Sequence, residues 1–199
     1  STLFPYTTLF RSSYNITHHK EVQNNSKGCG GVMRIAPIPL YAAVDNRMDI
    51  LDADKLAGDA AEITHQHPLG FISAALMSHV VYRLALNIEP TQDSMKHYIM
   101  EGVAEMRKQY KAYHNDVERM TELAERAIFL IDNGKTDLEN IGHLGEGWTG
   151  EEALAIALYC ALKHFDSFEE AMIAAVNHGG DSDRHTARDR RIAQQDKYD

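Results

Sequence analysis

The chain has 199 residues, 44% of them hydrophobic, which is enough for one domain with its own core and too apolar for a disordered protein. Its formal net charge of −9 at pH 7 excludes nucleic acid as a main partner, because binding phosphates requires a basic surface. Cys29 and Cys160 form no disulfide framework, so we expect a reducing compartment and a cytoplasmic location.

The first twelve residues, STLFPYTTLFRS, show no helical period. An edge strand is one interpretation of this stretch. We favour a translated sequencing-adapter contaminant and therefore predict a non-native leader over 1–12. No basic segment precedes an apolar region, so no signal peptide is predicted. The longest strongly apolar run, Ala153–Leu162, is too short to cross a bilayer, and no membrane partner is expected.

Beyond residue 40 the pattern indicates one helix after another and no alternating strand. Pro37 and Pro39 break the early part of VMRIAPIPLYAAV. Apolar and small residues then recur at helical spacing over 54–64. Pro68 suits the first turn of a helix that runs over 68–86 and is apolar on most sides, so this helix is expected at the centre.

Two longer, amphipathic helices are predicted next, over 91–113 and 116–132, with Gly134 in the position of a C-cap. Capping-box patterns precede the last two apolar runs, ALAIALYCAL and AMIAAV; they are Thr149 with Glu152 and Ser167 with Glu170. The predicted fold is therefore all-α with one core, and its loops lie at helix ends.

Two carboxylates, Asp181 and Asp183, follow the Gly179–Gly180 pair that ends the last predicted helix. Carboxylates two residues apart can direct oxygens at a common point, which suits a hard cation such as Mg²⁺ or Mn²⁺. The alternative is that both side chains bond only the backbone of the turn, as Asp commonly does after a helix.

Three further motifs could carry chemistry. The glycine-rich stretch NNSKGCGG, 24–31, offers N–H groups that could cradle a phosphate, or it is a tight turn without a ligand. The two histidines of THQHP, 64–68, could bind metal, form an acid–base pair or bond a sugar hydroxyl, or they simply complement a helix C-terminus. Trp148, the single tryptophan, could stack on a planar base or belong to the core.

In this order, NNSKGCGGVMRIAPI, THQHPLG, LGEGWTGEEALAIALYCAL and NHGGDSD resemble the ADP-ribosylglycohydrolase family from about Asn24 to Asp183. The resemblance implies a compact orthogonal all-α domain that hydrolyses ADP-ribosyl bonds with two Mg²⁺ or Mn²⁺ ions. It implies metal ligands at Asp181 and Asp183. It implies substrate-binding residues at Asn24, Asn25, Ser26, Lys27, Gly28, Cys29, Gly30, His65 and Trp148, with Ser26, His65 and the loop amides near the ribose or diphosphate and Trp148 near the adenine.

The sequence departs from the family pattern at both ends. Family members carry a Gly-Asp element and a Thr-Asp-Asp triplet before the glycine-rich loop, which supply the other half of the metal site and the usual candidate base. Neither occurs before Asn24, and Arg184 stands where the family has Ser or Thr. We therefore expect an incomplete domain over 13–183, a non-native tail over 184–199, an unidentified catalytic base and weak or absent hydrolysis.

Two alternative functions stay open. A non-catalytic module could bind ADP-ribose or an ADP-ribosylated protein or small molecule, and like the hydrolase it is expected to be a monomer. An unrelated metal phosphohydrolase on a helical scaffold would need His and Asp ligands on neighbouring helices, and the sequence shows no His-Asp pair.

Overall fold

The computed structural model describes residues 24–44 and 47–181. The predicted leader over 1–12, the predicted tail over 184–199 and Asp183 lie outside the described residues. The described part of the chain is built of helices, and its β-type pairing is an isolated antiparallel bridge between Gly28 and Thr149. The all-α prediction is thus confirmed.

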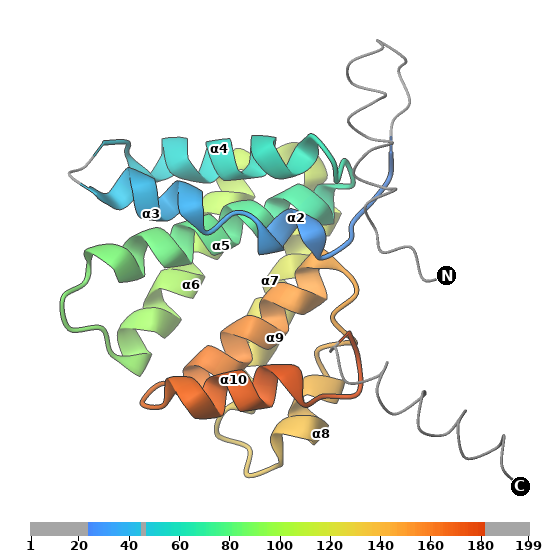
Figure 1. Ribbon diagram of the computed structural model, residues 1–199. Helices are drawn as coiled ribbons and strands as arrows, with labels where there is room; N and C mark the ends of the chain where they lie inside the picture. Colours follow the sequence, from blue (N-terminus) through green and yellow to red (C-terminus); the bar gives the residue numbers. More distant parts are fainter. Residues whose placement is uncertain (1–23, 45–46, 182–199) are drawn as a thin grey trace, which may run out of the picture.

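The helices pack around α5 (Figure 1). Their bounds are α2 (Gly30–Met33), α3 (Pro37–Ala43), α4 (Ile50–Glu62), α5 (Pro68–Leu86), α6 (Gln92–Gln109), the 3₁₀ segment η2 (Lys111–Tyr113), α7 (His114–Leu130), α8 (Asp137–Gly142), α9 (Gly150–Lys163) and α10 (Phe168–Val176). In Figure 1, α3 and α4 lie above α5, and α9 and α10 lie below it. The chain therefore returns to α5 from both sides.

Helix α5 begins at Pro68, as predicted, because proline's fixed φ suits the first helical position and its missing N–H is not needed there. The Nδ1 atom of His67 caps the helix by accepting a hydrogen bond from the Leu69 amide at 3.1 Å. Among the described residues, the helix that is long and apolar enough to cross a membrane is α5, and not the run Ala153–Leu162 named above. In this fold 67% of its most apolar window is buried, as in a core helix.

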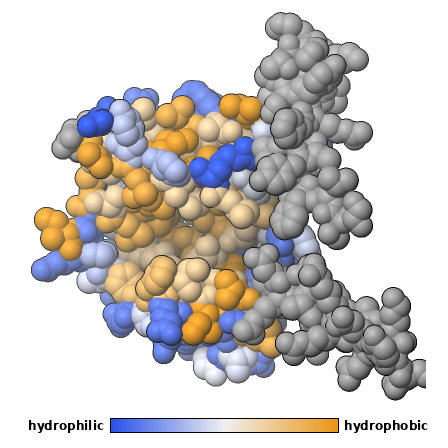
Figure 2. Space-filling view, in the orientation of Figure 1, coloured by the Kyte–Doolittle hydropathy of each residue, from blue (hydrophilic) through white to orange (hydrophobic). Residues whose placement is uncertain are grey.

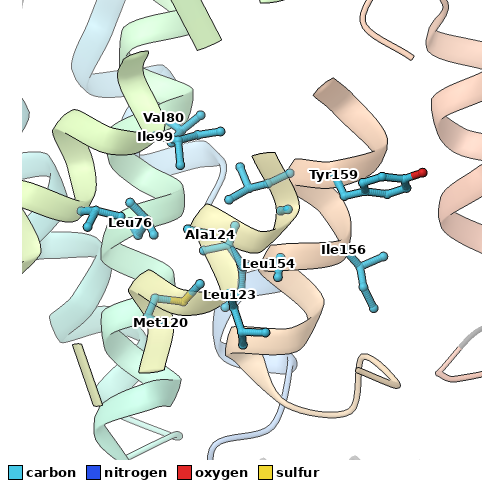
Figure 3. Close-up of a cluster of buried hydrophobic side chains, with 14 of the residues drawn as sticks. Leu76, Val80, Ile99, Met120, Leu123, Ala124, Leu154, Ile156 and Tyr159 are labelled. Carbon is cyan, nitrogen blue, oxygen red and sulfur yellow. The ribbon is translucent and has the colours of Figure 1, made fainter. Parts of the chain in front are cut away.

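Apolar side chains of four helices meet in the core (Figure 3). The buried members drawn there include Leu76 and Val80 of α5, Ile99 of α6, Met120 and Leu123 of α7, and Leu154, Ile156 and Tyr159 of α9. The hydroxyl of Tyr159 donates to Asp137 Oδ1 at 2.7 Å and accepts from Asn140 Nδ2 at 3.0 Å. A buried tyrosine is tolerated because its polar end finds partners, and this one fastens α8 to α9.

Three sequence-based predictions about helix ends need correction. Pro37 and Pro39 do not break their segment but occupy the first turn of α3, where proline is tolerated. The helix predicted over 91–113 is interrupted at Tyr110, where a 3₁₀ turn follows α6. Gly134 is not the C-cap of α7, because that position is Ile131; Gly134 lies in the following turn with φ +73°. The pattern located α6 and α7 but not α3, and the exact ends of these helices depend on contacts from elsewhere.

The capping box predicted at Thr149 is wrong. The Oγ1 atom of Thr149 is buried and has no hydrogen-bond partner among the described residues. Glu152 turns instead to the preceding loop, where its Oε2 accepts from the amides of Glu146 and Gly147 at 3.3 and 3.2 Å. At Ser167 half of the predicted box forms, because Oγ accepts from the Glu170 amide at 3.3 Å while the Glu170 carboxylate bonds a histidine.

Two His–Asp pairs exist in space although the sequence showed none. Nδ1 of His79 on α5 lies 2.7 Å from Oδ2 of Asp54 on α4, and both side chains are buried. Nε2 of His164 lies 2.9 Å from Oδ2 of Asp137. Burial raises the pKa of the Asp54 carboxyl, and the hydrogen bond with His79 opposes that effect. These pairs tie helices together, and neither belongs to a larger group of metal-ligating side chains in the described chain.

Apolar side chains also gather in the middle of the face shown in Figure 2. On α10 the exposed large hydrophobic residues are Phe168, Met172, Ile173 and Val176. Phe168, at the start of this helix, is 82% exposed. Only one side of this helix is therefore used in packing against α9.

Candidate functional site

The glycine-rich loop, residues 24–31, is fastened to the start of α9 by its backbone. The Cys29 amide donates to the Trp148 carbonyl at 3.1 Å, and the Gly150 amide donates to the Lys27 carbonyl at 2.7 Å. The isolated bridge between Gly28 and Thr149 lies between these two bonds. Two segments about 120 positions apart in the sequence are thus held side by side.

The loop amides are largely occupied, contrary to the expectation that they are left free. The Ser26 amide donates to Asn24 Oδ1 at 3.2 Å, and the Gly28 amide donates to Ser26 Oγ at 3.4 Å. The Cys29 amide is bound to Trp148, as above, and the Gly31 amide donates to the Gly28 carbonyl at 3.4 Å. Asn and Ser side chains commonly satisfy amides two residues on, so this loop is a self-bonded turn more than an open cradle.

His65 packs behind the loop. A Cβ atom on Gly31 would lie 3.2 Å from the His65 ring, and one on Gly70 would lie 3.0 Å from His65 Cβ. These glycines let two backbone segments approach the ring closely. Nδ1 of His65 lies 2.8 Å from Thr64 Oγ1 and 3.4 Å from Arg34 Nη2. Burial lowers the pKa of His65, and the Arg34 cation lowers it further, so the imidazole is neutral at neutral pH.

Trp148 lies on the loop before α9 and not in the core. Its side chain is 56% exposed. The indole Nε1 donates to Glu146 Oε2 at 3.2 Å, while the backbone carbonyl holds Cys29. More than half of this side chain is therefore open to solvent and available for stacking.

Asp181 joins the same region from the end of the chain that the structure describes. Its amide donates to the Glu146 carbonyl at 2.6 Å. Its Oδ2 accepts a weak hydrogen bond from Cys29 Sγ at 3.5 Å. Burial raises the pKa of the Cys29 thiol, and the hydrogen bond to Asp181 raises it further. The thiol is therefore protonated at neutral pH and acts as a donor to the carboxylate.

The structure brings four of the sequence-predicted positions, Ser26, His65, Trp148 and Asp181, around the Gly28–Gly31 turn. Asn24 is held by Gln66: its amide donates to Gln66 Oε1 at 2.7 Å, and its Oδ1 accepts from the Gln66 amide at 3.3 Å. Asn25 is exposed. His67 serves as the helix cap described above. A cavity of about 310 Å³ opens beside this region, lined by Glu146, His178 and the Gly179–Gly180 pair together with residues of α8.

Comparison with known proteins shows the family of this chain. The family model for ADP-ribosylglycohydrolase matches residues 6–187. The chain belongs to the ADP-ribosylglycohydrolase family. ADP-ribosylhydrolase ARH3 of Homo sapiens is 29% identical over 79% of this chain and 47% of that protein. ARH3 of Bos taurus is 26% identical, and an uncharacterized protein of Archaeoglobus fulgidus is 28% identical, each over 79% of this chain and 46% of the relative.

The chain spans about half the length of the curated relatives that it matches. No solved structure matches it. The family assignment therefore rests on sequence over most of this chain, and the geometry of the site is that of the described residues.

A metal centre of the kind expected for an ADP-ribosylglycohydrolase is not formed by the described residues. They contain no group of three or more His, Cys, Asp or Glu side chains that could hold an ion. Asp181 brings one carboxylate, Glu146 is engaged with Trp148, and Asp183 lies outside the described range. One carboxylate leaves most of the coordination sphere of a hard cation unfilled, so the described residues alone do not hold such an ion.

Several residues of the site were missed from the sequence. Glu146 receives both the Asp181 amide and the Trp148 indole, Arg34 accompanies His65, and Glu151 pairs with Lys27 at 2.7 Å. Glu151 stands at the start of α9, where an acidic residue is ordinarily a partner of the helix dipole. The available signal was a carboxylate at the head of a nearly continuous apolar run, which often indicates a buried partner.

Proposed function

We propose that this protein contributes the ADP-ribose-binding part of an ADP-ribosylhydrolase, which cleaves the N- or O-glycosidic bond of an ADP-ribosylated protein or small molecule. The observation that carries the proposal is the meeting of four separate motifs, at Ser26, His65, Trp148 and Asp181, around one turn. In a family member, such convergence of dispersed polar and aromatic groups is typical of a ligand site.

The chemistry of each group suits one part of ADP-ribose. The exposed Trp148 ring is available to stack on adenine. The neutral His65 imidazole and the Ser26 hydroxyl can bond ribose hydroxyls or phosphate oxygens. The exposed Arg34 guanidinium beside His65 can supply positive charge for the diphosphate. The anionic ligand thus requires no basic protein surface.

For catalysis we infer that Asp181 and Asp183 are two of the ligands of a Mg²⁺ or Mn²⁺ site. The described residues do not complete that site, and Arg184 follows Asp183 directly with a positive charge that opposes cation binding. When bound, such ions would orient the ribose and activate water. We therefore expect the 199-residue chain to bind ADP-ribose but to turn over ADP-ribosylated substrates slowly.

The experiment measures binding and hydrolysis separately on the purified chain. ADP-ribose binding is followed by quenching of the single tryptophan and checked by calorimetry. Hydrolysis is measured as release of ADP-ribose from a panel of ADP-ribosylated peptides with added Mg²⁺ or Mn²⁺. We expect saturable binding that Trp148→Leu weakens about tenfold when followed by calorimetry, because one stacking contact is worth roughly 1–1.5 kcal/mol.

Controls distinguish the outcomes. Asp181→Asn should reduce metal-dependent turnover, whereas Asp166→Asn, at an exposed carboxylate beyond α9, should leave it unchanged. Binding with no turnover under any metal condition would favour the non-catalytic module. Absence of ADP-ribose binding would contradict the proposed function.

A further inference from the structure

One ion pair in the site lies between a loop residue and a buried carboxylate. Nζ of Lys27 lies 2.7 Å from Oε1 of Glu151, and the two side chains are 41% and 2% exposed. Glu151 stands in the first turn of α9, and its other oxygen, Oε2, is buried without a hydrogen-bond partner in the described structure. Lys27 is thus the neutralising partner that the structure shows for a carboxylate taken out of water.

The pair is set within a row of backbone contacts. The Lys27 carbonyl accepts from the Gly150 amide at 2.7 Å, directly before Glu151, and the Cys29 amide donates to the Trp148 carbonyl. Lys27 therefore contacts the start of α9 through both its side chain and its backbone carbonyl. A buried carboxylate without a counter-charge is strongly destabilising, so the lysine cannot leave this position without cost.

We propose that Lys27 and Glu151 are positioning residues that hold the glycine-rich loop against α9, and that the Lys27 cation is not a ligand of the diphosphate. This inference rests on the proposed function for the identity of the ligand. It gives Lys27 a role other than the substrate-binding role that the resemblance implies. The exposed cation next to His65 is Arg34, and it retains the electrostatic role toward the anion.

The first test needs no ligand. Amide hydrogen exchange over residues 24–31 is measured in the wild-type chain, in Lys27→Met, and in the double variant Lys27→Met/Glu151→Met. Lys27→Met should expose the loop and raise its amide exchange rates about tenfold or more. The Glu151 carboxylate would lose its counter-charge, and conformations in which water reaches it would become more populated. The double variant should restore most of the protection, since two methionines leave no buried charge. Exchange in the middle of α5 should not change.

Lys108→Met is the matched control, because Lys108 pairs with Glu105 on the surface and is 71% exposed. Its loss should leave exchange in 24–31 as in the wild type. If Lys27→Met does not fold, Lys27→Arg and Glu151→Gln decide the point. Arginine should keep the loop as protected as in the wild type. Glu151→Gln should fold, because the neutral amide needs no counter-charge, but its loop should exchange faster than that of Lys27→Arg because the ion pair is lost.

The second test uses ADP-ribose, with affinity followed by Trp148 emission at several salt concentrations. Lys27→Met should lose affinity about tenfold with an unchanged salt dependence, and the double variant should recover to within about threefold of wild type. A weaker salt dependence, normal loop protection and no recovery in the double variant would overturn the inference and make Lys27 a direct ligand. If the wild type binds no ADP-ribose, the proposed function fails, while the exchange test still decides whether the pair holds the loop.

Discussion

Asp54 and His79 place a carboxylate and an imidazole inside the core, where they are 0% and 1% exposed. They join α4 to α5, and Nε2 of His79 lies 3.7 Å from Oε2 of Glu101 on α6. Moving charged groups out of water costs several kcal/mol for each ion, and only a close partner offsets that cost. Three helices are thus coupled through one imidazole ring.

We predict that His79→Leu lowers the free energy of unfolding by about 3–5 kcal/mol, because it strands the buried Asp54 carboxylate. Urea denaturation followed by circular dichroism measures the change. Lys55→Ala is the control on the same helix. It removes the Lys55–Asp59 ion pair, whose side chains are 63% and 55% exposed, and should produce no measurable change.

The double variant Asp54→Leu/His79→Leu tests the cause. If the cost comes from an unpaired buried charge and not from the lost shape of histidine, the double variant should be more stable than His79→Leu alone. A double variant as unstable as the sum of its two single changes would show that packing, not charge, governs this position.

Three threonines stand at N-cap positions of the described helices, and two of them, Thr136 and Thr149, have opposite environments. Thr136 of α8 forms a full capping box: its Oγ1 accepts from the Glu139 amide at 3.3 Å, and Glu139 Oε2 accepts from the Thr136 amide at 3.0 Å. Thr149 of α9 makes no such bond, and its hydroxyl is buried without a partner among the described residues. The same residue type at the same helix position therefore contributes differently.

We predict that Thr136→Val destabilises the protein by about 1 kcal/mol, the usual cost of losing an N-cap. Thr149→Val should be neutral or stabilising by up to about 1 kcal/mol, since valine has nearly the same shape and removes an unsatisfied buried hydroxyl. Thermal unfolding of both variants under one condition measures the difference. Equal losses of stability would mean that Thr149 caps its helix in solution.

The long helices could be predicted from the sequence because their apolar spacing is a local property. Pro68 marked the start of α5 correctly, and every predicted helix is present with its ends shifted by a few residues. The six-residue α8 was missed because it is too short to show a period. The capping box predicted at Thr149 was wrong because Glu152 accepts hydrogen bonds from the amides of Glu146 and Gly147. These residues lie outside the four-residue capping-box pattern.

On the scale of the whole molecule, the site depends on contacts that the sequence could not display. The motifs could be named one by one, and their order indicated the family. The bond between Cys29 and Asp181 spans 152 positions, and the occupation of the loop amides by Asn24, Ser26 and Trp148 follows from the folded backbone alone. Motif matching therefore found the candidate residues but attributed free donors to a loop that uses them itself.

The close approach of residues 180–181 to Glu146 holds the end of the described chain in place. A Cβ atom on Gly180 would lie 2.0 Å from the Glu146 carbonyl oxygen, the same atom that accepts the Asp181 amide. Two backbone segments cannot both remain there if a methyl group is inserted. Only glycine fits this position, so a single substitution should detach Asp181 from the site without disturbing the helical core.

We predict that Gly180→Ala makes Cys29 react about threefold to tenfold faster with a thiol-alkylating reagent. Burial is the largest cause of the raised thiol pKa, and moving Asp181 away relieves the hydrogen bond and the negative charge that raise this pKa further. Cys160 is 2% exposed, and burial raises its pKa to about 12, so it should stay unreactive and provide the internal reference. Gly179→Ala is the matched control, since a Cβ there meets no described atom within 4 Å. Equal Cys29 reactivity in the two variants would show that Asp181 is not held against the loop in solution.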